Sequence, residues 1–346
     1  MNKIMRRLTL ALLALLPVVS SCDLHEFPVA PKYTDINLKL SFSTDFPQWE
    51  YPVPEDSKTT VPSKSVLTSG EMRYIVRLYP QGTRSTRASY FQEFEFTKDV
   101  SEGYNDTFEL SVPEGDYSLM VWADLRERVE DKHFYNIDDF SQITFGTHIG
   151  NYEYRDAFRG ISEISVKTST VEHEPETFEL EMVRPLAKFE FVTTDILEFI
   201  DREVKAAALA GKTEVGDDAT KAIDLNTYKI VYYYVGYMPN TFNMFTDKPS
   251  DSVTGVNFNG RLLRLSEREA SLGFDYVFVN GRESSVTVQV GIYSEDGTQL
   301  SMTSPIKVPL RRSEHTLMKG KFLMQNASGG VGIDPSFEGE FVIPIL

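Results

Sequence analysis

Apolar and polar residues alternate along many short stretches of the chain. The clearest stretch is 36–42, where Ile, Leu, Leu and Phe alternate with Asn, Lys and Ser. Successive side chains of a strand point to opposite faces of a sheet, so this period of two predicts a half-buried strand. The first half of the chain repeats the pattern at 72–78, 108–112, 117–121 and 178–182. A turn-forming cluster at 113–116 divides two of these predicted strands.

The second half of the chain continues the pattern after Arg184-Pro185. It predicts strands at 187–191, 228–234, 286–292, 316–324 and 337–343. Short strands divided by turn signals favour antiparallel β-sandwiches. The chain is also long enough for two separate cores. We therefore expect an all-β protein of two tandem sandwich domains, one over 36–184 and one over 185–346.

One segment of the second half has a helical period instead. Apolar residues recur every four positions at Ile196, Ile200, Val204 and Ala208, which predicts one amphipathic helix over about 195–210. Asp195 with Glu198 resembles a capping box, and Gly211 suits the end of the helix. We expect the helix to cover an edge or a face of the second sandwich, and a partner-binding role is the alternative.

The N-terminus has the pattern of a bacterial lipoprotein signal. Basic residues precede an apolar stretch from Leu8 to Val19, and Ser20, Ser21 and Cys22 follow. The stretch is too short for a membrane-spanning helix, which needs about 20 residues. The run Val-Ser-Ser-Cys resembles a lipobox, in which the peptide is cut before the cysteine and the thiol is acylated. Because Cys22 is the only cysteine, it has no disulfide partner.

These signals divide the beginning of the chain into a signal peptide at 1–21 and a Pro-containing tether at 22–35. The expected partner of acylated Cys22 is a lipid bilayer, where each buried methylene contributes about 0.8 kcal/mol.

The charge of the chain excludes one class of partner. With 35 Lys and Arg against 51 Asp and Glu, the net charge is −16, and the chain from Cys22 onward carries −19. Nucleic-acid binding requires basic patches, so no nucleic acid is expected as a partner.

The sequence contains no recognisable catalytic or metal-binding motif. None of the five histidines has zinc-ligand spacing, and no nucleophile or phosphate-loop motif occurs. The pair Asp138 and Asp139 could serve a glycosidase, but among 51 acidic residues it is better explained as solvated charge. The stretch 127–139 is rich in oxygen ligands but lacks the order of a calcium loop. We expect no enzyme, no cofactor and no metal.

Several segments resemble the fimbrillin-like lipoproteins of Bacteroidetes, a group that includes fimbrial anchor and assembly lipoproteins and uncharacterised relatives. The segments occur in both halves of the chain and in the same order as in that group. They are CDLHEFP at 22–28, EGDYSLMVWADL at 114–125, MVRPLAKFEFVTTD at 182–195 and GGVGIDPSFEGEFVI at 329–343. The Arg-Pro-x-Ala-Lys at 184–188 could have a purely structural role, such as fixing the domain junction.

The resemblance implies two transthyretin-like sandwiches, held by lipid at the outer membrane and displayed at the cell surface. In polymerising members a protease cuts at arginine, the first strand leaves, and a neighbouring subunit adds a strand in its place. Anchor members keep their first strand. Only Lys32 is basic between Cys22 and Ile36, which favours an anchor or accessory subunit that contacts fimbrial subunits.

A surface lipoprotein that binds a glycan or another host ligand is the alternative function. Residues 46–69 are rich in Pro, Ser and Thr and predict a long loop. The aromatic side chains of Trp49 and Tyr51 on that loop would form the binding platform.

Overall fold

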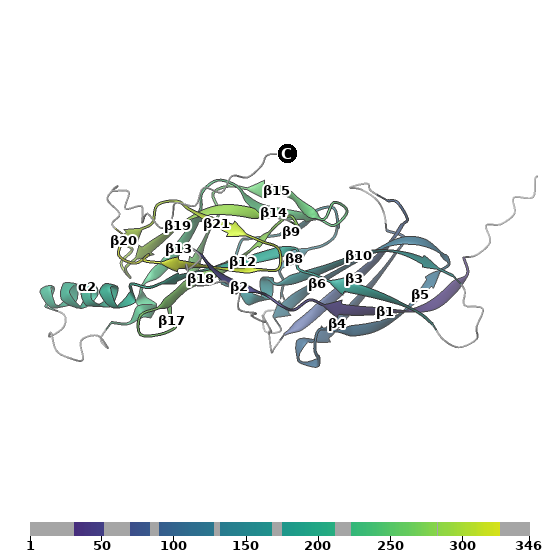
Figure 1. The fold of residues 1–346 in the computed structure, drawn as a ribbon, viewed down its shortest axis with the longest axis horizontal. Helices are drawn as coiled ribbons and strands as arrows, with labels where there is room; N and C mark the ends of the chain where they lie inside the picture. Colours follow the sequence, from purple (N-terminus) through teal and green to yellow (C-terminus); the bar gives the residue numbers. More distant parts are fainter. Residues whose placement is uncertain are drawn as a thin grey trace, which may run out of the picture.

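The described part of the chain folds into β-sheets and one α-helix, and Figure 1 shows these elements spread along one axis. The computed structural model describes residues 31–51, 70–83, 90–127, 132–167, 175–211, 223–281 and 283–325. The predicted all-β class, with one helix in the second half, is confirmed. Within these residues, no helix is long and apolar enough to cross a membrane.

Two sheets enclose the first hydrophobic core. One has the order β11-β1-β5 and the other β10-β6-β3-β4, with the short β7 paired to β6. The strands are β1 (Tyr33–Phe42), β3 (Glu71–Pro80), β4 (Gln92–Asp99), β5 (Asp106–Pro113), β6 (Gly115–Glu127), β7 (Lys132–His133), β10 (Ala157–Val166) and β11 (Glu176–Met182). Side chains from the predicted alternating positions meet between the sheets, among them Leu38, Tyr74, Leu110 and Val121. We call this unit the first sandwich.

Two further sheets form a second sandwich. Their orders are β17-β18-β12-β22-β2 and β16-β13-β19-β20, with β21 also paired to β19. The strands are β2 (Gln48–Tyr51), β12 (Leu186–Thr193), β13 (Lys229–Tyr234), β16 (Asn257–Gly260), β17 (Leu263–Arg264), β18 (Ala270–Phe278), β19 (Ser284–Tyr293), β20 (Gln299–Met302), β21 (Ile306–Leu310) and β22 (His315–Gly320). Parallel pairs occur beside the expected antiparallel ones, because β22 runs parallel to both β12 and β2.

A smaller sheet, β15-β14-β9-β8, lies in the middle of the molecule (Figure 1). Its strands are β8 (Tyr135–Asn136), β9 (Ile143–Phe145), β14 (Met238–Asn243) and β15 (Lys248–Val253). Trp122 of β6 contacts both Tyr135 and Phe242 from this sheet. The outer face of β3 and β6 is therefore buried as well, and it joins the hydrophobic core of the second sandwich.

The helix α2 (Ile196–Leu209) matches the predicted range, but its beginning differs from the prediction. The capping box is wrong, since the Asp195 side chain makes no bond to the first turn. Its carboxylate accepts instead from the backbone nitrogen of Met324, at 3.0 Å, and so holds the chain after β22. At the other end, Gly211 has a φ of +69°, a left-handed conformation that suits glycine, and it ends the helix as predicted.

The predicted loop over 46–69 is wrong at its beginning. Residues 48–51 form β2, which extends the sheet of β22 in parallel register, and Tyr51 packs against the second core. This placement removes Tyr51 from the proposed exposed platform. Residues 52–69 lie outside the described residues.

Three short 3-10 helices complete the described elements. They are η2 (Val100–Glu102), η3 (Glu153–Arg155) and η5 (Leu225–Thr227).

Candidate functional site

The chain passes between the two sandwiches several times, and Arg184 ties three of these passages together. Its side chain is fully buried in the segment between β11 and β12. The guanidinium donates to both carboxylate oxygens of Asp156, at 2.8–3.0 Å, just before β10 begins. It also donates to the carbonyls of Ser43 and Asp45, between β1 and β2.

Aromatic rings and charge both stabilise the buried Arg184. Its guanidinium carbon lies 4.4 Å from the centroid of Phe46 and 4.5 Å from that of Phe158. Burial alone would lower the pKa of Arg184, but the Asp156 carboxylate beside it raises the pKa above its ordinary value. The arginine of Arg-Pro-x-Ala-Lys therefore has the structural role expected at the junction.

The other distinctive motif, Trp-Ala-Asp at 122–124, also lies in the junction. Asp124 is fully buried and accepts two bonds from Arg73 of the neighbouring β3, at 2.9 and 2.6 Å. The indole nitrogen of Trp122 donates to the same carboxylate at 3.0 Å. Two of the four segments that carry the family resemblance thus contribute a residue to a buried charge pair, Asp124 with Arg73 and Arg184 with Asp156.

A third buried charge centre lies inside the second sandwich, at Asp275 of β18. Its carboxylate pairs with Arg155 of η3 and accepts from Tyr234 at 2.5 Å. His148 approaches the same carboxylate at 2.8 Å. Burial alone would raise the pKa of Asp275, but Arg155, followed by His148 and Tyr234, holds the pKa below its ordinary value. Asp275 is therefore a charged group that fixes the neighbouring chain segments.

His315 links three strands of one sheet from a buried position. From β22, its ring lies 3.3 Å from Glu190 of β12 and 3.4 Å from Gln48 of β2. Burial lowers the pKa of His315 below 6.5, although Glu190 opposes this. The unfolded chain therefore takes up a proton more readily than the folded chain as the pH falls below 6.5.

We expect the free energy of unfolding to decrease as the pH falls below 6.5, and we expect His315→Gln to reduce this slope. Urea titrations at several pH values measure the effect. Some slope should remain, because burial also lowers the pKa of His133. An unchanged slope in His315→Gln would show that His315 does not cause the pH dependence.

The N-terminal strand β1 is paired along both edges. It runs antiparallel to β5 from Tyr33 to Leu40 and parallel to β11 from Ile36 to Phe42. Its inward side chains Ile36, Leu38 and Leu40 are at most 2% exposed. β1 is thus the central strand of its sheet and an integral part of the first sandwich. It is the strand that corresponds to the one polymerising fimbrillin-like subunits are expected to release.

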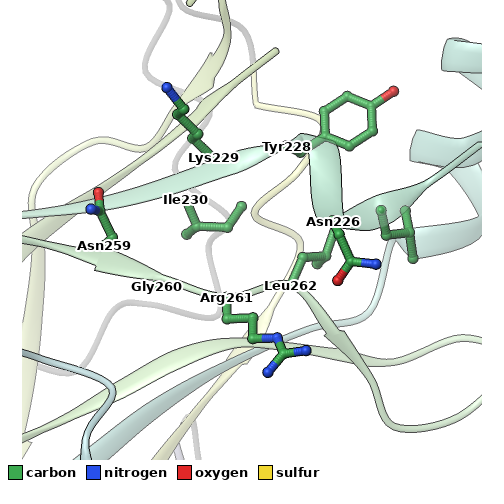
Figure 2. Close-up of a pocket in the computed structure, with 9 residues that line it drawn as sticks. Asn226, Tyr228, Lys229, Ile230, Asn259, Gly260, Arg261 and Leu262 are labelled. Carbon is green, nitrogen blue, oxygen red and sulfur yellow. The ribbon is translucent and has the colours of Figure 1, made fainter. Parts of the chain in front are cut away.

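A pocket of about 280 Å³ lies where β13 begins and β16 ends, and Figure 2 shows its lining. The lining contains two cations, Lys229 and Arg261, and two amides, Asn226 and Asn259. Lys229 points away from Arg261, so the two charges do not converge on one point (Figure 2). The pocket offers hydrogen-bonding groups but no paired-charge site for an anion.

The structure also places several residues considered from the sequence. Cys22, the expected lipidation site, lies outside the described residues. Asp139 accepts from the backbone of Ser141, and Asn136 accepts from the backbone of Asp138, so this acidic stretch forms local turns. Among the described residues, no group of three or more His, Cys, Asp or Glu side chains could hold a metal ion.

These features define an all-β protein whose sandwiches are locked together by buried Arg–Asp pairs. The model of a family of unknown function, DUF6562, matches residues 33–345. The chain belongs to this family. No curated protein matches the sequence.

Solved structures with limited similarity include three fimbrial proteins. The fimbrial anchor protein Mfa2 from Porphyromonas gingivalis is 10% identical with a TM-score of 0.38, over 78% of this chain and 82% of that one. A fimbrial assembly protein from Parabacteroides distasonis is 11% identical with a TM-score of 0.36, over 84% and 92%. The tip fimbrial protein Mfa3 from Porphyromonas gingivalis is also 11% identical, with a TM-score of 0.36, over 80% and 81%.

Proposed function

We propose that the protein is a membrane-tethered, cell-surface lipoprotein that serves as a structural anchor or accessory subunit of a fimbria-like assembly. The lipobox at Cys22 supports the tether, and the motifs shared with fimbrillin-like lipoproteins support the assembly role. The choice of anchor rests on the segment before β1, where Lys32 is the only Lys or Arg between Cys22 and Ile36, so an arginine-directed protease has no site there to release β1. The pairing of β1 along both edges is consistent with a strand that stays in place.

Contact with the next subunit would occur by strand addition at an edge of the second sandwich. Backbone bonds to an added strand supply affinity, and alternate side chains supply specificity. Edge strands β2 and β20 have only four residues each, so an incoming strand would extend a short ladder. Such short edges are typical of proteins that avoid unselective pairing.

A crosslinking pull-down of the acylated protein from its native cells tests the assembly role. Mass spectrometry should identify fimbrillin-like subunits among the crosslinked partners. Recovery of none, together with binding of the soluble body to a glycan array, would support the ligand-binding alternative instead.

Cys22→Ala should move the protein from the membrane fraction to the soluble fraction, because no acyl chain would then hold it. Immunoblots of fractionated cells measure this change, with Ser21→Ala as a matched control that keeps the thiol. A Cys22→Ala protein that stays in the membrane fraction would contradict the tether.

A disulfide that locks β1 in place tests whether the protein acts as an anchor or as a polymerising subunit. Asn37 and Glu109 are register partners in the β1–β5 ladder, so Asn37→Cys with Glu109→Cys should form a disulfide across it. We expect the locked protein to support assembly as well as the wild type does, because an anchor never releases β1. Fibre counts by electron microscopy, with and without reductant, give the result. Loss of assembly that reductant restores would show that β1 leaves, and would contradict the anchor proposal.

A further inference from the structure

Aromatic side chains gather at the end of the first sandwich where β1 begins. Tyr33 is 54% exposed and Phe91 is 50% exposed. The Phe91 ring lies 5.9 Å from that of Tyr117, whose hydroxyl donates to the Pro113 carbonyl at 3.1 Å. Tyr33 pairs with Pro113 in the β1–β5 ladder. Pro113 and Tyr117 are buried, and Tyr33 lies close enough to the Tyr117 hydroxyl to raise its pKa. The exposed rings of Tyr33 and Phe91 therefore flank the buried Tyr117, and we call Tyr33 and Phe91 the aromatic tip.

The aromatic tip has the composition of a surface that becomes covered at a membrane. Tyrosine combines an apolar ring with a polar hydroxyl, and it is enriched where membrane proteins meet lipid headgroups. Tyr33 and Phe91 each leave about half of their surface open to solvent, although both lie beside Tyr117, which belongs to the first core. Exposed apolar patches of this kind mark interaction surfaces.

The charge around the aromatic tip is nearly balanced, unlike that of the whole chain. Lys32 lies 3.7 Å from Glu114. Lys167 follows Val166, which pairs with Gly115, so the antiparallel register places it beside Glu114. With Asp35 and Asp116 included, two lysines face three carboxylates here, whereas the chain carries a net charge of −16. Repulsion from an anionic lipid surface is consequently weaker at this end.

The length of the tether places this end near the bilayer. Ten residues lie between Cys22 and Tyr33. Eleven residue-to-residue steps of about 3.5 Å therefore join the two positions, and they reach at most about 40 Å. Figure 1 shows that β1 begins at one end of the long axis, with the second sandwich at the other. The aromatic tip is thus the described surface that the tether holds closest to the lipid.

We propose that the aromatic tip contacts the phospholipid surface of the membrane that holds Cys22, and thereby fixes the long axis of the body relative to that membrane. This inference rests on the proposed lipid tether. The acyl chains keep the protein at the membrane, and the tip sets its orientation there. Tyr33 and Phe91 lie at headgroup depth, and the second sandwich points away toward its partner.

Fluorescence quenching by spin-labelled lipids tests the contact. The full acylated protein is reconstituted into vesicles of phosphatidylethanolamine and phosphatidylglycerol that carry a spin label near the headgroup end of the acyl chain. A Phe91→Trp variant reports on the tip. A Leu265→Trp variant is the matched control, because Leu265 is 53% exposed in the second sandwich. The wild-type signal from Trp49 and Trp122 is subtracted from both.

We expect the Phe91→Trp signal to be quenched at least about twofold more than the control signal, as for residues that enter the headgroup layer. Adding Tyr33→Ser to Phe91→Trp should reduce this quenching. Equal quenching at the two positions would overturn the contact. The contact would also be overturned if the introduced tryptophan of Phe91→Trp became more shielded from solvent as the concentration of lipid-free protein increased. A second copy of the protein, and not lipid, would then cover the tip.

The mass of the N-terminal peptide separates this inference from the proposed tether. If the N-terminal peptide is diacylated but quenching is equal at the two positions, the proposed tether stands and only the lipid contact of the tip is ruled out. If the peptide carries no acyl chains, both the tether and the proposed orientation are ruled out.

Discussion

Arg184→Ala should lower the free energy of unfolding by about 3–5 kcal/mol, because it leaves the buried Asp156 carboxylate without its partner. The same change leaves the carbonyls of Ser43 and Asp45 without their donor. Equilibrium unfolding in urea measures the loss. Arg311→Ala is the matched control, since its pair with Glu283 is exposed and should contribute less than about 1 kcal/mol.

A double variant at Arg184 and Asp156 identifies the source of the lost unfolding free energy. If the unpaired Asp156 causes most of the destabilisation, then Arg184→Ala with Asp156→Ala should cost less than the two single changes added together. An Arg184→Ala protein as stable as the Arg311→Ala control would show that Arg184 does not hold the junction.

Asp275→Asn should have a similar effect in the second sandwich, about 3–5 kcal/mol, because it leaves the fully buried Arg155 without a carboxylate. The loss should also depend on pH. The pKa of Asp275 is lower in the folded chain than its ordinary 3.8, so its contribution is present above pH 3.8 and is lost as the pH falls through the folded value. Asp275→Asn removes this acid-dependent contribution.

Unfolding followed by circular dichroism across acidic pH tests both statements. Glu295→Gln is the control, because Glu295 is exposed on a turn and the change should stay within about 0.5 kcal/mol. If the free energy of unfolding depends on acidic pH in the same way for the wild type and Asp275→Asn, then Asp275 does not cause the acid-dependent loss of stability.

The strands with one buried face could be predicted from the sequence, because their signal is local. Ile36, Leu38 and Leu40 alternate with polar residues, and all three face the first core. The helix was predictable for the same reason, since Ile196, Ile200 and Val204 recur on one face and are buried.

Features that depend on distant partners were not predictable in this way. The four residues of β2 pair with β22, more than 260 residues away in the chain, and no short pattern marks that pairing. Arg73 alternates with apolar residues and looks like a solvent-facing position, but Asp124 and the small middle sheet cover it. Ile75 and Trp122 on the same outer face were the available signal, because exposed faces seldom carry such large apolar side chains.

The candidate site was predictable only in part. The Arg-Pro-x-Ala-Lys motif, which resembles a motif of the fimbrillin-like lipoproteins, singled out Arg184 and suggested a junction role. The partners of Arg184, however, come from two other passages of the chain. Asp275 carried no signal, because a single aspartate in an apolar strand does not indicate which arginine will meet it.

The placement of β1 also determines how the molecule would respond to pulling. Figure 1 shows β1 running along the long axis, and the strand begins at Tyr33, the end that the proposed tether would pull. Tension between the membrane and the far end would therefore act along the strand, and it would load the backbone bonds to β5 and β11 together, in shear. A strand pulled sideways at its edge would instead lose its bonds one at a time. The first sandwich thus has the geometry of a mechanical clamp, in which the bonds on both sides of β1 resist the load together.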